Sequence, residues 1–275
     1  MTSPRAALLS YSAVIVTGGS SGIGKSFIAL AGKLNRDLIF CNLSRRAPDK
    51  NSSEISELKL NHFACDLAQP AEIERGAAAV RDFLGRTVPS GKILLINNSG
   101  FGTYGRFPEP NLARQLEMID VNARAVLHLT GLLLPLLRAR GGAVVTVAST
   151  AAFQPTPYLA TYGATKAFVL HWSHALNAEL RGSGVRALAV CPGPTATAFF
   201  RAAGLEPGNH AESTGMSSEA VAAATFRALA SGRAEVVPGL RNRLVAFSGG
   251  LVSKTFATRV ARVVIGRHRL QHVAK

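Results

Sequence analysis

Short runs of consecutive apolar residues alternate along the chain with longer segments whose apolar residues recur at helical spacing. Most of the short runs lack a period of two, which is expected for strands whose sheet is covered on both faces. The predicted strands are Ala13–Thr17, Leu38–Asn42, His62–Cys65, Ile93–Asn97, Ala143–Ser149, Val185–Cys191 and Glu235–Val237. The predicted helices are Lys25–Leu34, Ala71–Leu84, Leu112–Arg138, Thr161–Arg181 and Ser218–Ala230. This alternation predicts an α/β fold, a doubly wound parallel sheet of about seven strands with helices on both faces.

Two segments fall outside this alternation. The stretch Pro192–Ser217 is rich in proline, glycine, threonine and alanine, and an irregular loop of that length in a compact domain is usually functional. The last segment, Leu240–Lys275, mixes apolar with basic residues. We therefore predict one domain over residues 1–239, with its loop at 192–217, and a basic amphipathic helical extension over residues 240–275.

Positive charge is concentrated in that extension. The chain has a formal net charge of +15, and eight bases with no acid lie between Gly239 and Lys275. These bases are Arg241, Arg243, Lys254, Arg259, Arg262, Arg267, Arg269 and Lys275. A basic amphipathic helix can lie on an anionic membrane surface, and the same pattern also suits a helix that packs on the domain with its bases in water. Nucleic acid is not an expected partner, because no reader motif accompanies the charge.

The apolar pattern does not indicate an integral membrane protein or an exported one. The nearest candidate, Ala125–Leu137, is shorter than the roughly 18 residues of a membrane span, and no stretch resembles a signal peptide. The three cysteines, Cys41, Cys65 and Cys191, form no C-x-x-C pair and are expected to be buried thiols in a reducing compartment. We expect a cytoplasmic protein whose one route to a membrane surface is the basic extension.

A glycine-rich turn, T-G-G-S-S-G-I-G from Thr17 to Gly24, joins the first predicted strand to the first predicted helix. Backbone N–H groups in such a turn can face a diphosphate, helped by the N-terminus of the helix, and glycines permit tight bending and close approach. The spacing, G-x-x-x-G-x-G, differs from the G-x-G-x-x-G dinucleotide fingerprint. By itself the turn indicates a Rossmann-type nucleotide site, with a plain tight turn as the alternative.

Six further motifs follow this turn in order along the chain. They are Asp66-Leu67, N-N-S-G at Asn97–Gly100, Asn122 in V-N-A-R-A-V-L, Ser149 in V-T-V-A-S-T, Y-G-A-T-K at Tyr162–Lys166 and P-G-P-T-A-T at Pro192–Thr197. Together with the glycine turn, this series resembles the short-chain dehydrogenase/reductase family over roughly Ser10–Pro238. Ser99, where the family usually has alanine, is the one departure in the core motifs.

The Y-x-x-x-K spacing suits the chemistry that the resemblance implies. Residues i and i+4 lie on one face of a helix, so Tyr162 and Lys166 can point at one site, and a nearby ammonium lowers the pKa of a phenol from about 10. The resemblance implies that Tyr162 is the acid in hydride transfer to a carbonyl and that Lys166 also binds the nicotinamide ribose. It further implies that Ser149 binds the substrate carbonyl and that Asn122 holds a water in a proton relay. No metal is expected.

The end of the second predicted strand indicates which nicotinamide cofactor binds. Users of NAD place an acid about 20 residues after the third glycine, but that position here is Ser44, followed by Arg45 and Arg46. A guanidinium suits a 2′-phosphate, so we predict NADP(H), with a solvated basic turn as the alternative. The expected cofactor-binding residues are Gly18, Ser20, Ser21, Gly22, Ile23, Gly24, Ser44, Arg45, Asp66, Leu67, Asn98, Gly100, Tyr162, Lys166, Pro192, Gly193, Thr195 and Thr197.

The resemblance places the substrate pocket among Gly100–Phe107, Thr150–Tyr158 and the loop Pro192–Ser217, with Phe199-Phe200 in a lid. These segments supply seven aromatic residues, which suit an apolar carbonyl compound and equally suit ordinary loop packing: Phe101, Tyr104, Phe107, Phe153, Tyr158, Phe199 and Phe200.

We therefore expect an NADPH-dependent reductase of a ketone or aldehyde, with apolar and lipid-like compounds as the substrate class. The alternatives are an NAD-dependent alcohol or steroid dehydrogenase and a non-catalytic dinucleotide-binding regulator. The resemblance also implies a homodimer or homotetramer that forms through the helices Leu112–Arg138 and Thr161–Arg181.

Overall fold

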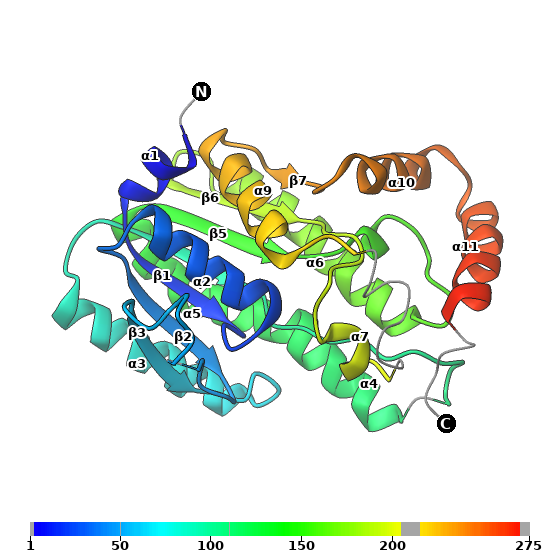
Figure 1. Ribbon diagram of the computed structural model, residues 1–275, viewed down its shortest axis with the longest axis horizontal. Helices are drawn as coiled ribbons and strands as arrows, with labels where there is room; N and C mark the ends of the chain where they lie inside the picture. Colours follow the sequence, from blue (N-terminus) through cyan, green and yellow to red (C-terminus); the bar gives the residue numbers. More distant parts are fainter. Residues whose placement is uncertain (1–2, 50, 110, 205–214, 270–275) are drawn as a thin grey trace.

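The computed structural model describes residues 3–49, 51–109, 111–204 and 215–269 (Figure 1). Its centre is a seven-stranded sheet in the order β3-β2-β1-β4-β5-β6-β7, and every neighbouring pair is parallel. The strands are β1 (Tyr11–Thr17), β2 (Ile39–Ser44), β3 (Lys59–Ala64), β4 (Lys92–Asn97), β5 (Gly142–Val147), β6 (Val185–Val190) and β7 (Glu235–Val236). The predicted doubly wound α/β fold is confirmed.

Helices cover both faces of this sheet, which explains why the strands are apolar on both sides. One face carries α1 (Pro4–Leu9), α2 (Gly22–Leu34) and α9 (Ser218–Ala230), and the other carries α3 (Pro70–Thr87), α5 (Ala125–Arg140) and α6 (Ala160–Glu179) (Figure 1). In β1, Val14 and Val16 enter the first core, while Ala13 and Ile15 enter the second. An uninterrupted apolar run in a strand is the consequence. The short helix α1 was not predicted.

The predicted helix Leu112–Arg138 is a continuous helical run in three parts. Helix α4 (Leu112–Ile119) passes through a π-helical turn, Asp120–Arg124, into α5. Such turns are frequent at functional sites, and this one contains Asn122. The whole run is long and apolar enough, by length and composition, to cross a membrane. Leu129, Leu133 and Leu137 are nevertheless buried against the sheet, as expected for a core helix of a globular domain.

The segments outside the alternation contain further helices. The loop after β6 contains α7 (Phe199–Ala202), and its residues 205–214 lie outside the described residues. The basic extension forms two helices, α10 (Leu240–Leu251) and α11 (Lys254–Arg269), and Lys275 also lies outside the described residues.

The fifth strand ends earlier than predicted. Strand β5 stops at Val147, so Ser149 does not end the strand. It is instead the N-cap of a 3-10 turn, Thr150–Ala152, and its hydroxyl oxygen accepts a hydrogen bond from the Ala151 N–H at 3.1 Å. The chain therefore leaves the sheet two residues before Ser149, the residue whose hydroxyl is predicted to bind the substrate carbonyl.

Candidate active site

A cavity of about 680 Å³ opens at the carboxyl ends of the strands, the edge at which open parallel sheets bind ligands. All the predicted site residues line it except Gly24 and Asn122. The lining includes Gly18, Ser20, Ser21, Gly22, Ile23, Ser44, Arg45, Asp66, Leu67, Asn98, Gly100, Ser149, Tyr162, Lys166, Pro192, Gly193, Thr195 and Thr197. Residues from most of the chain's length thus converge on one hollow.

The glycine turn after β1 is shaped to cradle an anion. Gly18 and Gly22 have positive φ angles of 70° and 54°, a backbone conformation that other residues rarely adopt. Helix α2 begins at Gly22, and the side chain of its N-cap, Ser21, makes no capping hydrogen bond. N–H groups of the first helical turn therefore stay available to a ligand, which fits the diphosphate of a dinucleotide.

Close packing explains why residue 24 is a glycine, and this residue does not line the cavity. A Cβ atom at this position would lie 2.2 Å from the carbonyl oxygen of Gly18 and 2.6 Å from Nδ2 of Asn98. The helix therefore approaches the turn so closely that only glycine fits. The part of Gly24 in cofactor binding stays a prediction.

The end of β4 holds the glycine turn in place. The backbone N–H groups of Asn98 and Ser99 both donate to the hydroxyl of Thr17, at 2.9 and 3.0 Å. The side-chain amide of Asn98 donates to the carbonyl of Thr17 at 3.0 Å. Asn98 thus lines the cavity and ties two of its walls together.

A buried polar network, which the sequence analysis missed, supports the same turn from β2. Asn42 is fully buried, and its Oδ1 accepts the Gly19 N–H at 2.7 Å. Its Nδ2 donates to the Ser44 hydroxyl at 2.8 Å and lies 3.0 Å from Nδ1 of His62 on β3. The Ser44 hydroxyl donates in turn to the Arg46 carbonyl at 2.7 Å. Its proton is therefore engaged, and Ser44 supports the basic turn from below.

Arg45 follows β2 and lines the cavity there, in a cluster of charges. Its guanidinium is 3.6 Å from a carboxylate oxygen of Glu117 on α4, and the Arg45 side chain is 61% exposed. Arg114, which also lines the cavity, pairs with the same carboxylate at 2.6 Å and stacks over the Phe101 ring at 3.8 Å. Two guanidinium groups therefore share the Glu117 carboxylate, and Arg46, the next residue after Arg45, also lines the cavity.

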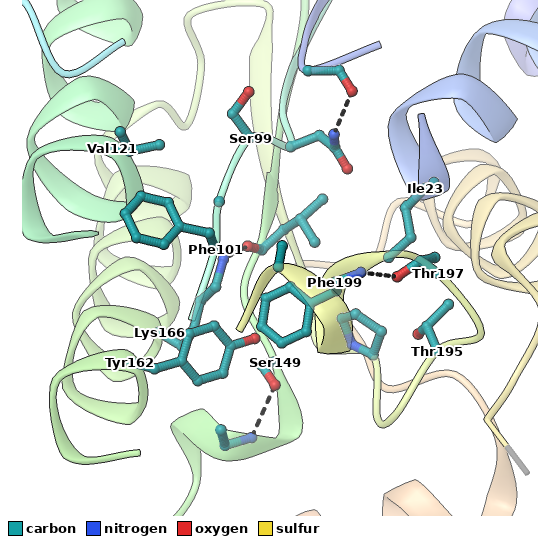
Figure 2. A pocket seen from close by; sticks show the side chains of 18 of the residues that line it. Ile23, Ser99, Phe101, Val121, Ser149, Tyr162, Lys166, Thr195, Thr197 and Phe199 are labelled. Carbon is teal, nitrogen blue, oxygen red and sulfur yellow. Dashed lines mark hydrogen bonds between the residues drawn. The ribbon is translucent and has the colours of Figure 1, made fainter. Parts of the chain in front are cut away.

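Tyr162, Lys166 and Ser149 meet at the other end of the cavity. Tyr162 and Lys166 are one turn apart on α6, and Nζ of Lys166 lies 5.8 Å from the centre of the Tyr162 ring. Figure 2 shows the Tyr162 hydroxyl directed toward Ser149, with the ring of Phe199 beside it. A phenol, an alcohol and an ammonium therefore share one small volume.

Lys166 is held in a dry environment beneath this group. Its ammonium donates to the Val147 carbonyl at 2.8 Å, and its side chain is almost completely buried. Burial lowers the pKa of Lys166 to about 8, because the charged form loses its hydration. Cys191, near Lys166, is also buried, and burial raises the pKa of its thiol, so the thiol stays neutral. Cys41, Cys65 and Cys191 are all free and buried, as expected.

Asn122 lies just behind the cavity wall and braces it. Its Oδ1 accepts the Phe101 N–H at 3.1 Å, and its Nδ2 donates to the Phe101 carbonyl at 2.9 Å and to the Thr165 hydroxyl at 3.2 Å. Thr165 precedes Lys166 on α6, so Asn122 joins the loop after β4 to α6. The water relay that the family resemblance implies for Asn122 stays a prediction.

The apolar wall is partly the one predicted. Phe101, Tyr104 and Phe199 line the cavity, and the rings of Phe199 and Tyr162 are 5.4 Å apart. Phe107 and Tyr158 line a separate cavity of about 240 Å³, and Phe153 packs in the core near α6. The side chain of Phe200 lies outside the described residues.

The basic extension also forms part of the wall, which the sequence analysis missed. Val264 and Ile265 of α11 line the cavity, and Ile265 packs against the cluster of Tyr104, Leu159 and Ala203. The run Val263–Ile265 was visible in the sequence, but its place in the fold was not. Helix α10 packs on the loop after β6, because a Cβ atom at Gly193 would meet the Asn242 side chain at 2.2 Å.

The sequence of this chain is similar to those of known oxidoreductases. The sequence model of the short chain dehydrogenase family matches residues 12–207. A very-long-chain 3-oxoacyl-CoA reductase of Bos taurus is 32% identical over 193 residues, 66% of this chain and 59% of that protein.

Solved structures show the same likeness. A short-chain dehydrogenase from Sphingobium yanoikuyae in complex with NADPH has a TM-score of 0.70 at 28% identity, over 87% of this chain and 93% of that one. A short-chain dehydrogenase/reductase from Burkholderia phymatum in complex with NAD has a TM-score of 0.72 at 21% identity, over 86% and 92%.

Proposed function

Because the chain belongs to the short-chain dehydrogenase/reductase family of oxidoreductases, we propose that it reduces a ketone or aldehyde of an apolar, lipid-like substrate with hydride from NADPH. The family expected from the motifs is thereby confirmed. One observation carries the proposal: Tyr162, Lys166 and Ser149 converge at one end of a cavity whose other end holds Arg45. A dinucleotide laid along the strand ends, as in open α/β sheets, would span the two.

The chain's own residues supply binding, orientation and the proton. NADPH, when bound, supplies the hydride. The Ser149 hydroxyl donates a hydrogen bond to the substrate carbonyl and holds it against Tyr162. The Tyr162 hydroxyl donates its proton to the oxygen as negative charge develops there, and the ammonium of Lys166 favours the phenolate that remains. The Phe199 ring excludes water from this oxygen, which strengthens each of these interactions.

The proposed substrate class rests on the apolar wall. Tyr104, Phe199 and Ile265 pack in one cluster with Tyr162, and Phe101 and Val264 also line the cavity. The Bos taurus relative, named a very-long-chain 3-oxoacyl-CoA reductase, supports a carbonyl on an acyl chain. The cavity of about 680 Å³ is too small to hold a cofactor together with the whole of a long-chain substrate. The far end of a long chain would therefore extend out of the cavity beside Val264 of α11.

A series of methyl ketones of increasing chain length tests this function. With NADPH in excess, we expect kcat/KM to rise with each added methylene, since burying one CH₂ is worth about 0.8 kcal/mol, or roughly fourfold. The rise should stop where the chain reaches solvent. The loss of nicotinamide absorbance measures the rate. No turnover of any ketone or aldehyde, with cofactor bound, would favour the non-catalytic regulator.

The preference for NADPH is proposed from the charges that follow β2 in the cavity wall. Arg45→Ala is expected to weaken NADPH binding by about tenfold, because a charge-assisted hydrogen bond to the 2′-phosphate is lost. NADH binding should not change. Glu117→Gln is expected to strengthen NADPH binding by about threefold, since the carboxylate that now pairs with Arg45 and Arg114 would no longer compete. Fluorescence titration of the bound nicotinamide measures both.

Arg36→Ala is the matched control for this titration. Arg36 is also exposed and also paired with a glutamate, Glu57 at 2.7 Å, but it does not line the cavity. Both affinities should equal those of the wild type. Equal binding of NADPH and NADH to the wild type would contradict the preference and turn the search toward an NAD-dependent alcohol dehydrogenase.

Assembly and location complete the proposal. Exposed Leu112, Leu116 and Ile119 on α4 and exposed Phe168 on α6 support a homodimer or homotetramer through these helices. A monomeric mass in light scattering would contradict it. Three reduced, buried cysteines support a cytoplasmic location, and fractionation of cells would check this.

A further inference from the structure

The two helices of the extension expose an unusually large apolar surface. Of the sixteen large apolar side chains that the described residues expose, ten lie between Leu240 and Val264. Figure 1 shows α10 and α11, in orange and red, outside the layers that cover the sheet. Scattered exposed apolar residues are ordinary, but a concentrated group marks an interaction site.

These side chains follow the helical repeat, so each helix has one apolar outer stripe. On α10 they are Leu240, Leu244, Phe247 and Leu251, at spacings of four, three and four residues, and they are 61–73% exposed. On α11, Phe256, Val260 and Val263 repeat the spacing of four and three. The inner side of α11 is held by Ala257 and Ala261, which are buried. The apolar stripes therefore face outward without being needed for packing.

Basic side chains surround these stripes. Arg241, Arg243, Lys254, Arg259 and Arg262 are all exposed, and none of them is in an ion pair with another described residue. The segment from Gly239 onward contains no acid at all. An apolar stripe with unpaired bases beside it is complementary to the surface of an anionic bilayer, where acyl chains lie beneath phosphates.

The apolar surface is continuous with the active-site cavity. Val264 is 52% exposed and also lines the cavity, and Ile265 continues the wall inward. Helix α11 is also packed closely against the loop before α6, because a Cβ atom at Gly266 would lie 3.3 Å from the Tyr158 ring. A surface seated on α11 would therefore lie at the mouth of the cavity.

We propose that α10 and α11 dock this protein on an anionic phospholipid bilayer, with their apolar stripes in the boundary between headgroups and acyl chains. The mouth beside Val264 then opens toward the lipid, so an apolar carbonyl substrate enters without crossing water; this second part rests on the proposed function. A second copy of the chain is a poorer occupant, since it would bring the same bases with no acid to meet them. Nucleic acid would leave the apolar stripes in water.

Co-sedimentation of the full chain with vesicles tests the docking without cofactor or substrate. We expect most of the protein to sediment with vesicles of phosphatidylcholine and phosphatidylglycerol, little with phosphatidylcholine alone, and less at high salt. The triple variant Phe247→Ser, Leu251→Ser, Phe256→Ser should bind at least tenfold more weakly. Leu9→Ser is the matched control, because Leu9 is 60% exposed on α1, outside the extension.

Several results would overturn the docking. One is no sedimentation of the wild type, or equal sedimentation with both kinds of vesicle. Another is loss of vesicle binding in Leu9→Ser. A third is release of the protein from the vesicles by duplex DNA, at concentrations at which competing lipid also releases it. A fall in oligomer mass in the triple variant, without vesicle binding by the wild type, would assign the stripes to a second copy. NADPH titration of each variant shows that the fold is intact. It also separates this proposal from the proposed function, since either can fail alone.

Discussion

Tyr162→Phe is expected to lower kcat for ketone reduction by about a thousandfold while NADPH affinity changes less than twofold. The variant keeps the ring that packs at 5.4 Å from Phe199 and removes only the hydroxyl directed toward Ser149. Proton donation by a positioned side chain contributes about 10²- to 10⁴-fold. Without it, the oxygen of the reduced substrate has no acid beside it in a site that excludes water. Stopped-flow measurement of nicotinamide absorbance in a single turnover separates this step from product release.

Tyr158→Phe provides the control for this experiment. It makes the same chemical change four residues earlier, at a ring that lines the smaller cavity and not the larger one. We expect its kcat to stay within about twofold of the wild type. Comparable rates for Tyr162→Phe and wild type would show that another group delivers the proton. An unchanged cellular phenotype in Tyr162→Phe would support the regulator.

Lys166→Met is expected to lower kcat by about a hundredfold or more and, at the same time, to stabilise the cofactor-free protein by about 2 kcal/mol at pH 7. The two effects have one cause. A buried ammonium with a pKa of about 8 is disfavoured by its surroundings at pH 7, and the cost of that pKa shift is about 3 kcal/mol. The Val147 carbonyl, which loses its donor, offsets roughly 1 kcal/mol. Urea unfolding of the two proteins measures the difference.

The gain in stability should depend on pH in a defined direction. The pKa of Lys166 is lowered in the folded state to about 8 from its ordinary value of 10.5. Below pH 8 the buried Lys166 ammonium is charged, and it lowers the free energy of unfolding by its full amount. Between about pH 8 and pH 10.5 the unfolded state binds more protons, so wild-type stability rises. The advantage of Lys166→Met should shrink over this window. Lys33→Met, at an exposed position of α2, is the matched control for the substitution itself. A pH-independent difference would contradict the burial argument.

The hydrophobic pattern within each segment was enough to predict most strands and helices of this fold. The continuous apolar run of β1 already indicated a sheet covered on both faces, and the spacing of Tyr162 and Lys166 placed two side chains on one helix face. The structure confirms the sheet and brings both side chains to the strand ends. Local sequence suffices for such features because the repeat of a helix or strand fixes direction over a few residues.

Features that join distant segments could not be predicted. Asn42 and His62 meet because β2 and β3 pair in register, and that register is not written in either strand alone. The π-helical turn at Asn122 lies inside a segment with an ordinary helical pattern. Ile265 reaches the cavity only because α10 and α11 fold back over the loops near Gly193 and Tyr158. Tertiary packing, and not local preference, decides all three.

Val264 belongs both to the wall of the cavity and to the outer surface of the last helix. Under the proposed function and the proposed docking, a substitution of Val264 would change two properties together: the range of substrates that enter the cavity and the affinity of the last helix for a bilayer. A substitution of Val263, which is exposed and does not line the cavity, would change only the affinity for a bilayer.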